Sequence, residues 1–151
     1  MLIYKDSSNM YIAKIADFGN SSIVRGNNGI VMTMTWPWVA PEWEEEYKFN
    51  PLDAKKMDAY SFGMLCLWLI LYMSLNNPEG NFEDLRSKHR GNTYAASISL
   101  IESHGSLQAP QKEKLDKLFS LTLVKDPNCR SFDFNQFLGC LTTDRCDFQN
   151  Y

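Results

Sequence analysis

An aspartate, a phenylalanine and a glycine, Asp17-Phe18-Gly19, directly follow a run of residues with the composition of a β-strand. A carboxylate held at the end of a strand can bind a hard cation such as Mg²⁺, which prefers oxygen ligands and retains several waters. Nucleotide phosphates would then supply further ligands. The alternative interpretation is an ordinary strand-to-loop corner with a solvated aspartate.

Three further motifs follow along the chain. Ala40-Pro41-Glu42 comes first, residues 58–63 (DAYSFG) then begin a strongly apolar run, and residues 126–130 (DPNCR) lie between two expected helices. Each motif alone occurs by chance. Their order and their contexts make a chance combination improbable.

Together the four motifs resemble the C-terminal lobe of a eukaryotic-type protein kinase, and the resemblance extends over the chain to about Leu141. It implies an α+β, mainly α-helical fold with an N-terminal β-hairpin, and one partial kinase domain over residues 1–151. In the complete family member ATP and Mg²⁺ are the cofactors and a protein is the substrate. The resemblance makes Asp17 the metal ligand and Phe18 an apolar plug that positions it. Gly19 lets the chain turn sharply.

Residues 17–42 correspond to the activation segment of the family. Its Ser21, Ser22 and Thr33 are candidate phosphorylation sites, because added phosphate can order such a loop by pairing with arginine. Serines in a solvated loop more often have no such role.

The residues before Ala40 indicate whether the family member would phosphorylate serine and threonine or tyrosine. By resemblance, Thr35 has a catalytic role, because Ser/Thr kinases have a threonine here that contacts the catalytic aspartate. Tyrosine kinases tend to have proline at this position, although Trp38 before Val39 is typical of them. Ser/Thr specificity is therefore favoured over Tyr specificity.

The resemblance also pairs Glu42 with Arg130 in a buried ion pair that anchors the activation segment to the helical core. Leaving either partner alone in the interior would cost about 3–5 kcal/mol. Asp58 corresponds to an aspartate that hydrogen-bonds the backbone of the catalytic loop, and an acid at the start of a helix also suits the helix dipole. The acids of residues 44–46 are expected to form a solvated helix face.

Several catalytic parts of the family are missing from the sequence. The catalytic loop, His-Arg-Asp followed by an asparagine, would precede the hairpin, and residues 1–3 match the positions directly after it. The Gly-rich loop, the phosphate-binding lysine and its glutamate belong to the N-terminal lobe and are also absent. His89-Arg90 is followed by glycine and does not replace the loop. We therefore expect the chain alone neither to bind ATP and Mg²⁺ nor to transfer phosphate.

Two hypotheses follow. One is the truncated C-terminal lobe of an ATP-dependent Ser/Thr protein kinase, and the other is a non-catalytic, kinase-like (pseudokinase) module that binds a partner. In both, the missing N-terminal lobe or a partner covering the same surface is expected to pack on the apolar helix and on Phe18.

The composition of the chain excludes several classes of protein. The 151 residues are 44% hydrophobic and 22% charged, as in soluble single domains. A net charge of −3 argues against a nucleic-acid binder. The four cysteines form no CxxC pair, which argues against a zinc site. The N-terminus does not have the pattern of a signal peptide. We therefore expect a cytoplasmic protein with free thiols. Residues 59–75 contain no charge, but a buried core helix is favoured over a membrane helix.

Turn chemistry and hydrophobic spacing predict the elements that hold these motifs. A hairpin is predicted from Leu2 to Tyr4 and from Tyr11 to Ala16, followed by an extended stretch from Ile30 to Thr35. A long apolar helix is expected to be capped by Asp53, ended by Asn76-Asn77-Pro78, and buried on all sides, with four core residues at Leu67, Leu69, Ile70 and Leu71. After a polar loop at 79–92, shorter helices are predicted over Thr93 to Ser103, Gln111 to Val124 and Phe134 to Leu141.

Overall fold

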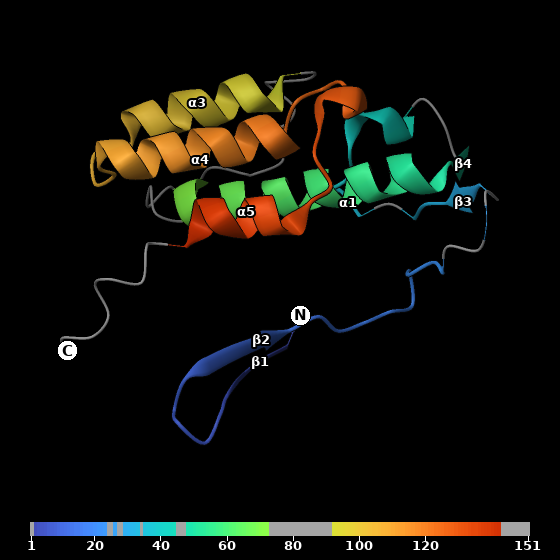
Figure 1. The fold of residues 1–151 in the computed structure, drawn as a ribbon, viewed down its shortest axis with the longest axis horizontal. Helices are drawn as coiled ribbons and strands as arrows, with labels where there is room; N and C mark the ends of the chain where they lie inside the picture. The colour runs from blue at the N-terminus through green and yellow to red at the C-terminus, as the bar shows by residue number, and fades with distance from the viewer. Residues whose placement is uncertain are drawn as a thin grey trace.

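Four α-helices and two small antiparallel β-ribbons make up the described part of the chain (Figure 1). The computed structural model describes residues 2–23, 26, 29–33, 35–44, 48–72 and 92–142. The strands are β1 (Leu2–Lys5), β2 (Tyr11–Lys14), β3 (Ile30–Val31) and β4 (Lys48–Phe49). The helices are α1 (Pro51–Cys66) with a π-helical continuation (Leu67–Tyr72), α3 (Thr93–Ser103), α4 (Ala109–Thr122), α5 (Phe134–Leu141), and two 3₁₀ helices (Pro41–Glu44 and Pro127–Cys129). The mainly helical α+β class is confirmed.

The predicted hairpin is confirmed, with Leu2 opposite Lys14 and Lys5 opposite Tyr11. Its turn is closed by Asp6, whose Oδ1 accepts hydrogen bonds from the backbone N–H groups of Ser8 and Met10, each at 2.9 Å. This Asx-type turn is the local chemistry expected of aspartate. Strand β2 ends two residues before Ala16, the predicted end.

A second ribbon pairs β3 with β4, and Ile30 lies opposite Phe49. An extended stretch was predicted from Ile30 to Thr35, but the strand ends at Val31. Strand β4 was not predicted, because two residues are too few to show a strand period. The pairing joins the segment before Ala40 to the chain that enters α1.

Helix α1 begins earlier than predicted. Asn50, not Asp53, is the cap: its Oδ1 accepts from the N–H groups of Leu52 and Asp53, each at 2.9 Å. Pro51 follows it in the first helical position, where the missing N–H is no loss. Asp58 therefore lies two turns inside the helix, beyond the first turn to which the dipole effect is confined. The helix-dipole interpretation of Asp58 is wrong.

The π-helical continuation of α1 is less buried than predicted. Leu67 and Leu71 are fully buried, but Leu69 is 48% exposed and Ile70 is half-buried. None of the described helices is long and apolar enough to cross a membrane. The predicted helix end at residues 76–78 and the polar loop up to residue 91 lie outside the described residues.

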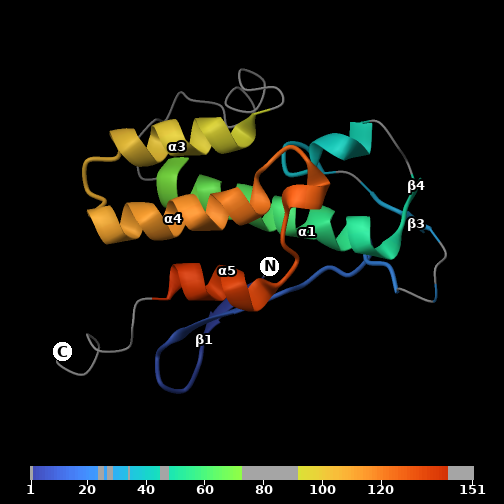
Figure 2. The ribbon, with the colours of Figure 1, turned by 45° about the horizontal axis from the view of Figure 1, so that its top comes forward.

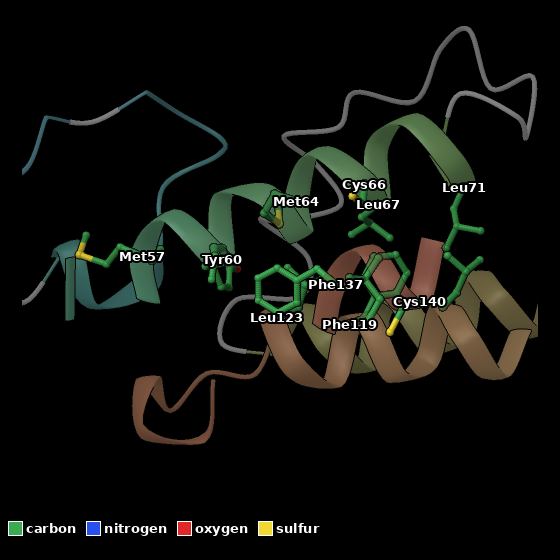
Figure 3. Close-up of a cluster of buried hydrophobic side chains, with 14 of the residues drawn as sticks. Met57, Tyr60, Met64, Cys66, Leu67, Leu71, Phe119, Leu123, Phe137 and Cys140 are labelled. Atoms are coloured by element: carbon green, nitrogen blue, oxygen red, sulfur yellow. The ribbon is translucent and has the colours of Figure 1, made fainter. Parts of the chain in front are cut away.

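Helix α4 lies at the centre of the helical body and contacts α1, α3 and α5 (Figure 2). The core side chains come from α1 and its continuation on one side, and from α4 and α5 on the other, including Met64, Leu67, Phe119 and Phe137 (Figure 3). Helices α1 and α4 approach closely at Gly63, where a Cβ would lie 2.3 Å from the Thr122 Oγ1.

The bounds of α3 and α5 agree with the predictions. Helix α4 begins at Ala109 rather than at Gln111, because Pro110 occupies its first turn and Gln108 provides the capping box. It ends at Thr122, two residues before the predicted end.

Candidate functional site

The predicted partners Glu42 and Arg130 form a bidentate ion pair in the structure. Nη1 of Arg130 donates to Oε1 of Glu42 at 2.6 Å, and Nη2 donates to Oε2 at 2.9 Å. The Arg130 side chain is 0% exposed and that of Glu42 is 15% exposed. Two parallel charge-assisted hydrogen bonds in this fork geometry are stronger and more directional than an ordinary ion pair.

Two further hydrogen bonds engage the Arg130 guanidinium. Nε donates to the carbonyl of Val124 and Nη2 to that of Lys125, both at 2.7 Å. The guanidinium lies 4.8 Å from the centre of the Tyr60 ring, a cation–π geometry. These contacts compensate much of the free-energy cost of burying the charge.

The turn before Arg130 is built by its own sequence. Asp126 caps the short 3₁₀ helix by accepting from the N–H of Asn128 at 2.8 Å, and Pro127 takes the first helical position. This turn directs Arg130 back toward the end of α4. The Asp-Pro-x-x-Arg spacing thus has a local structural cause.

Residues 35–44 are held on α1 by contacts other than the ion pair. Ser61 Oγ donates to the carbonyl of Trp38 at 3.0 Å, and the Trp38 ring meets Trp68 edge-on at 5.9 Å between centroids. The indole of Trp43 donates to the carbonyl of Met32 at 2.9 Å. The Ala-Pro-Glu segment is therefore tied both to α1 and to the residue that follows β3.

The Asp17-Phe18-Gly19 turn is exposed along its length. Asp17 has a left-handed backbone with φ of 66°, an uncommon conformation that aspartate tolerates better than most residues. Its Oδ1 accepts from the N–H of Gly19 at 3.3 Å. The positive φ thus falls on Asp17, while Gly19 is not in the left-handed region.

Phe18 is 67% exposed. Its role as an apolar plug that positions Asp17, and its cover by the missing lobe or a partner, stay predictions. The carbonyl of Phe18 accepts from the hydroxyl of Ser21 at 2.7 Å, which continues the turn. Ser22, Thr33 and Thr35 are exposed, and no described contact brings Thr35 to Asp17.

Asp58 lines a cavity of about 230 Å³ between α1, the strand β3 and the loop after Asp17. Asn20, Ser21 and Ser22 form one wall and Lys55 lies beside Asp58. Partial burial raises the pKa of the Asp58 carboxyl above its usual value of 3.8.

The described residues alone do not fit a Mg²⁺–ATP site. They contain no group of three or more His, Cys, Asp or Glu residues able to hold a metal ion. Asp17 presents one exposed carboxylate, already engaged with the N–H of Gly19. A single ligand of this kind gives neither the positioning nor the electrostatic stabilisation that phosphoryl transfer needs.

Sequence reasoning missed two residues that build this site. Tyr60, fully buried, stacks on Arg130, and its hydroxyl lies 2.8 Å from Thr93 Oγ1. Asn50 sets where α1 begins, and its position directly before Pro51 was the available signal. Glu44 is exposed as expected, whereas residues 45–47 lie outside the described part.

No protein-family model matches the chain, and no solved structure matches it. The chain is similar to a probable leucine-rich repeat receptor-like protein kinase of Arabidopsis thaliana, with 31% identity over 125 residues, or 77% of the chain. It spans only 10% of the length of that relative. The similarity supports a relation to protein kinases at this coarse level.

Proposed function

We propose that the chain is the C-terminal lobe of a protein-kinase domain that, in a complete protein, transfers phosphate from ATP to serine or threonine. The Glu42–Arg130 pair carries the proposal. It joins the Ala-Pro-Glu motif to the Asp-Pro-x-x-Arg motif through two hydrogen bonds across most of the chain. The sequence similarity to a receptor-like kinase supports the same class independently of this geometry.

The proposed part of this lobe in catalysis is positional. The ion pair and the contacts of Trp38 with α1 fix residues 35–44, on which a protein substrate would rest. Asp17 is proposed as one ligand of a Mg²⁺ site completed by groups that this sequence does not contain. Since those groups are required for the chemistry, the chain alone is proposed to be inactive.

A non-catalytic, kinase-like binding module is the second candidate. Its supporting observation is the exposure of the hairpin and of Phe18, which offer apolar surface to a partner. In either case we place the protein in the cytoplasm, because Cys66, Cys129 and Cys140 are free thiols, which accord with a reducing compartment.

The test uses the protein isolated from its natural source with an antibody against this chain, assayed with Mg²⁺ and radiolabelled ATP on a generic protein acceptor. The proposal predicts phosphoserine or phosphothreonine in the acceptor. Asp17→Asn introduced at the locus should abolish transfer, while Glu44→Gln, at another exposed acid, should not. Absence of transfer by the wild-type protein would favour the binding module, and transfer unaffected by Asp17→Asn would contradict the assignment of Asp17.

A further inference from the structure

A buried hydrogen bond joins the first turn of α3 to helix α1. Oγ1 of Thr93 lies 2.8 Å from the hydroxyl oxygen of Tyr60. Thr93 is 6% exposed and Tyr60 is 1% exposed, so water has little access to either hydroxyl. A buried hydroxyl that loses its partner bears the full cost of its desolvation. The two side chains therefore hold each other in place.

The same tyrosine also packs on the Glu42–Arg130 ion pair. Its ring faces the guanidinium of Arg130, whose Cζ lies 4.8 Å from the ring centre. Arg130 in turn donates two hydrogen bonds to Glu42, in the 3₁₀ helix Pro41–Glu44. Because Thr93 fixes the hydroxyl end of the Tyr60 side chain, it also fixes the ring against which the guanidinium packs. Three successive contacts thus connect α3 to the Ala-Pro-Glu segment.

These contacts join segments that are far apart in the sequence. The Thr93–Tyr60 bond spans 33 residues and the Glu42–Arg130 pair spans 88. In Figures 1 and 2, the first turn of α3, the turn after α4 and the 3₁₀ helix Pro41–Glu44 lie together at one end of the helical body. Chains of packed side chains of this kind carry energetic coupling between sites.

The next residue of α3 makes a hydrogen bond of similar length that leads elsewhere. The hydroxyl of Tyr94 donates to Oδ1 of Asp116 at 2.7 Å, in the middle of α4. Its loss should weaken the packing of α3 on α4 without acting through Tyr60. The two neighbouring hydroxyl contacts therefore separate an effect on the anchor from a general loss of stability.

We propose that Thr93 is a positioning residue for the Glu42–Arg130 anchor, on which it acts through the hydroxyl and the ring of Tyr60. The first turn of α3 and the Ala-Pro-Glu segment are then coupled, and a coupling free energy acts equally in both directions. A partner that binds and orders the first turn of α3 would also order the Ala-Pro-Glu segment. The consequence for a protein substrate rests on the proposed function, because that segment is its proposed support. The coupling itself does not depend on phosphoryl transfer.

The test is amide hydrogen exchange of the 151-residue chain, followed by nuclear magnetic resonance. The probe is the backbone N–H of Trp43, which donates to the carbonyl of Ala40 at 3.2 Å. Thr93→Val keeps the shape of the side chain and removes its hydroxyl, so it should accelerate exchange at Trp43 roughly two- to tenfold. Tyr60→Phe should act in the same direction. Thr93→Ser keeps the hydroxyl and should exchange at the wild-type rate.

Tyr94→Phe is the matched control, since it removes one hydroxyl from the same turn of α3. It should leave the exchange rate at Trp43 unchanged. In the reverse direction, Glu42→Gln should accelerate exchange at the N–H of Ala96, which donates to the carbonyl of Asn92 at 3.2 Å at the start of α3. This second arm asks the same question without a substitution in α3. Far-UV circular dichroism of each variant verifies that the helical body is folded.

A wild-type exchange rate at Trp43 in Thr93→Val would overturn the proposal. Equal acceleration by Tyr94→Phe would also overturn it, because that result would show a general loss of stability. Acceleration by Thr93→Ser as large as that by Thr93→Val would do the same, since the hydroxyl would then have no part in the effect. A natural protein that transfers no phosphate would refute the proposed function alone, because the exchange rates decide the coupling independently.

Discussion

Replacing Arg130 by alanine removes the guanidinium that joins the turn after α4 to Glu42 of the Ala-Pro-Glu segment. The guanidinium donates two hydrogen bonds to Glu42 and two to backbone carbonyls. Its loss leaves a carboxylate of low exposure without a partner, which costs about 3–5 kcal/mol when the charge stays buried. Because the Glu42 side chain is 15% exposed, water can reach part of it, and the lower half of that range is expected.

The assay is urea and thermal unfolding followed by circular dichroism. A loss of about 3–4 kcal/mol, the lower half of that range, corresponds to a fall in Tm of roughly 6–16 °C for a chain of this size. Lys117→Ala, a matched loss of an exposed cation on α4, should change the free energy of unfolding by less than about 0.5 kcal/mol. Arg130→Lys should recover only part of the loss, because an ammonium cannot reproduce the fork.

A double-mutant cycle isolates the pair itself. Glu42→Ala should cost less than Arg130→Ala, because Arg130 keeps its two carbonyl acceptors. The double variant should reveal a coupling energy of about 1–3 kcal/mol. Equal Tm values for Arg130→Ala and Lys117→Ala, or a coupling energy near zero, would refute the reasoning.

Three further predictions concern packing, protonation and thiol reactivity. Gly63→Ala should destabilise the chain by about 1–3 kcal/mol in urea unfolding because its Cβ meets Thr122, whereas Gly139→Ala, with open space in α5, should stabilise it by about 0.5–1 kcal/mol. Burial raises the pKa of Asp58 in the folded state above the unfolded value of 3.8. The free energy of unfolding is therefore highest below pH 3.8, where Asp58 is protonated in both states, and it falls as the pH rises through the pKa of the folded state. Asp58→Asn should therefore stabilise the chain at pH 7 by less than about 1 kcal/mol, with no gain below pH 3.8; a loss at pH 7 would contradict this. Burial raises the pKa of the Cys66 thiol to about 11, so at pH 8 a thiol reagent should modify exposed Cys129 before Cys66, which it should reach only on unfolding.

The sequence predicted the elements whose local signals were strong. The turn at Asp6, the spacing of Phe134 and Phe137, and the Asp-Pro-x-x-Arg turn each encode their structure in a few neighbouring residues, and all were found. The Glu42–Arg130 contact came from the family resemblance, because no local pattern specifies a pairing over such a distance.

The remaining features depend on tertiary contacts that a pattern cannot carry. The exposure of Leu69 and Phe18 depends on which surfaces pack against them. The sequence does not show this, because an apolar residue is found both in cores and on surfaces. The stacking of Tyr60 on Arg130 depends on how α1 meets the turn after α4. The cap at Asn50 was readable, but Asp53 offered an equally plausible local signal.

We propose that these residues form the C-terminal lobe of a protein-kinase domain. The reading frame upstream of the Met1 codon tests this proposal most directly. Sequencing the natural transcript across this point should reveal, in the same frame, a His-Arg-Asp motif with its asparagine immediately before Met1 and a Gly-rich loop further upstream. Stop codons or sequence without these motifs, in every transcript that encodes the chain, would contradict the claim.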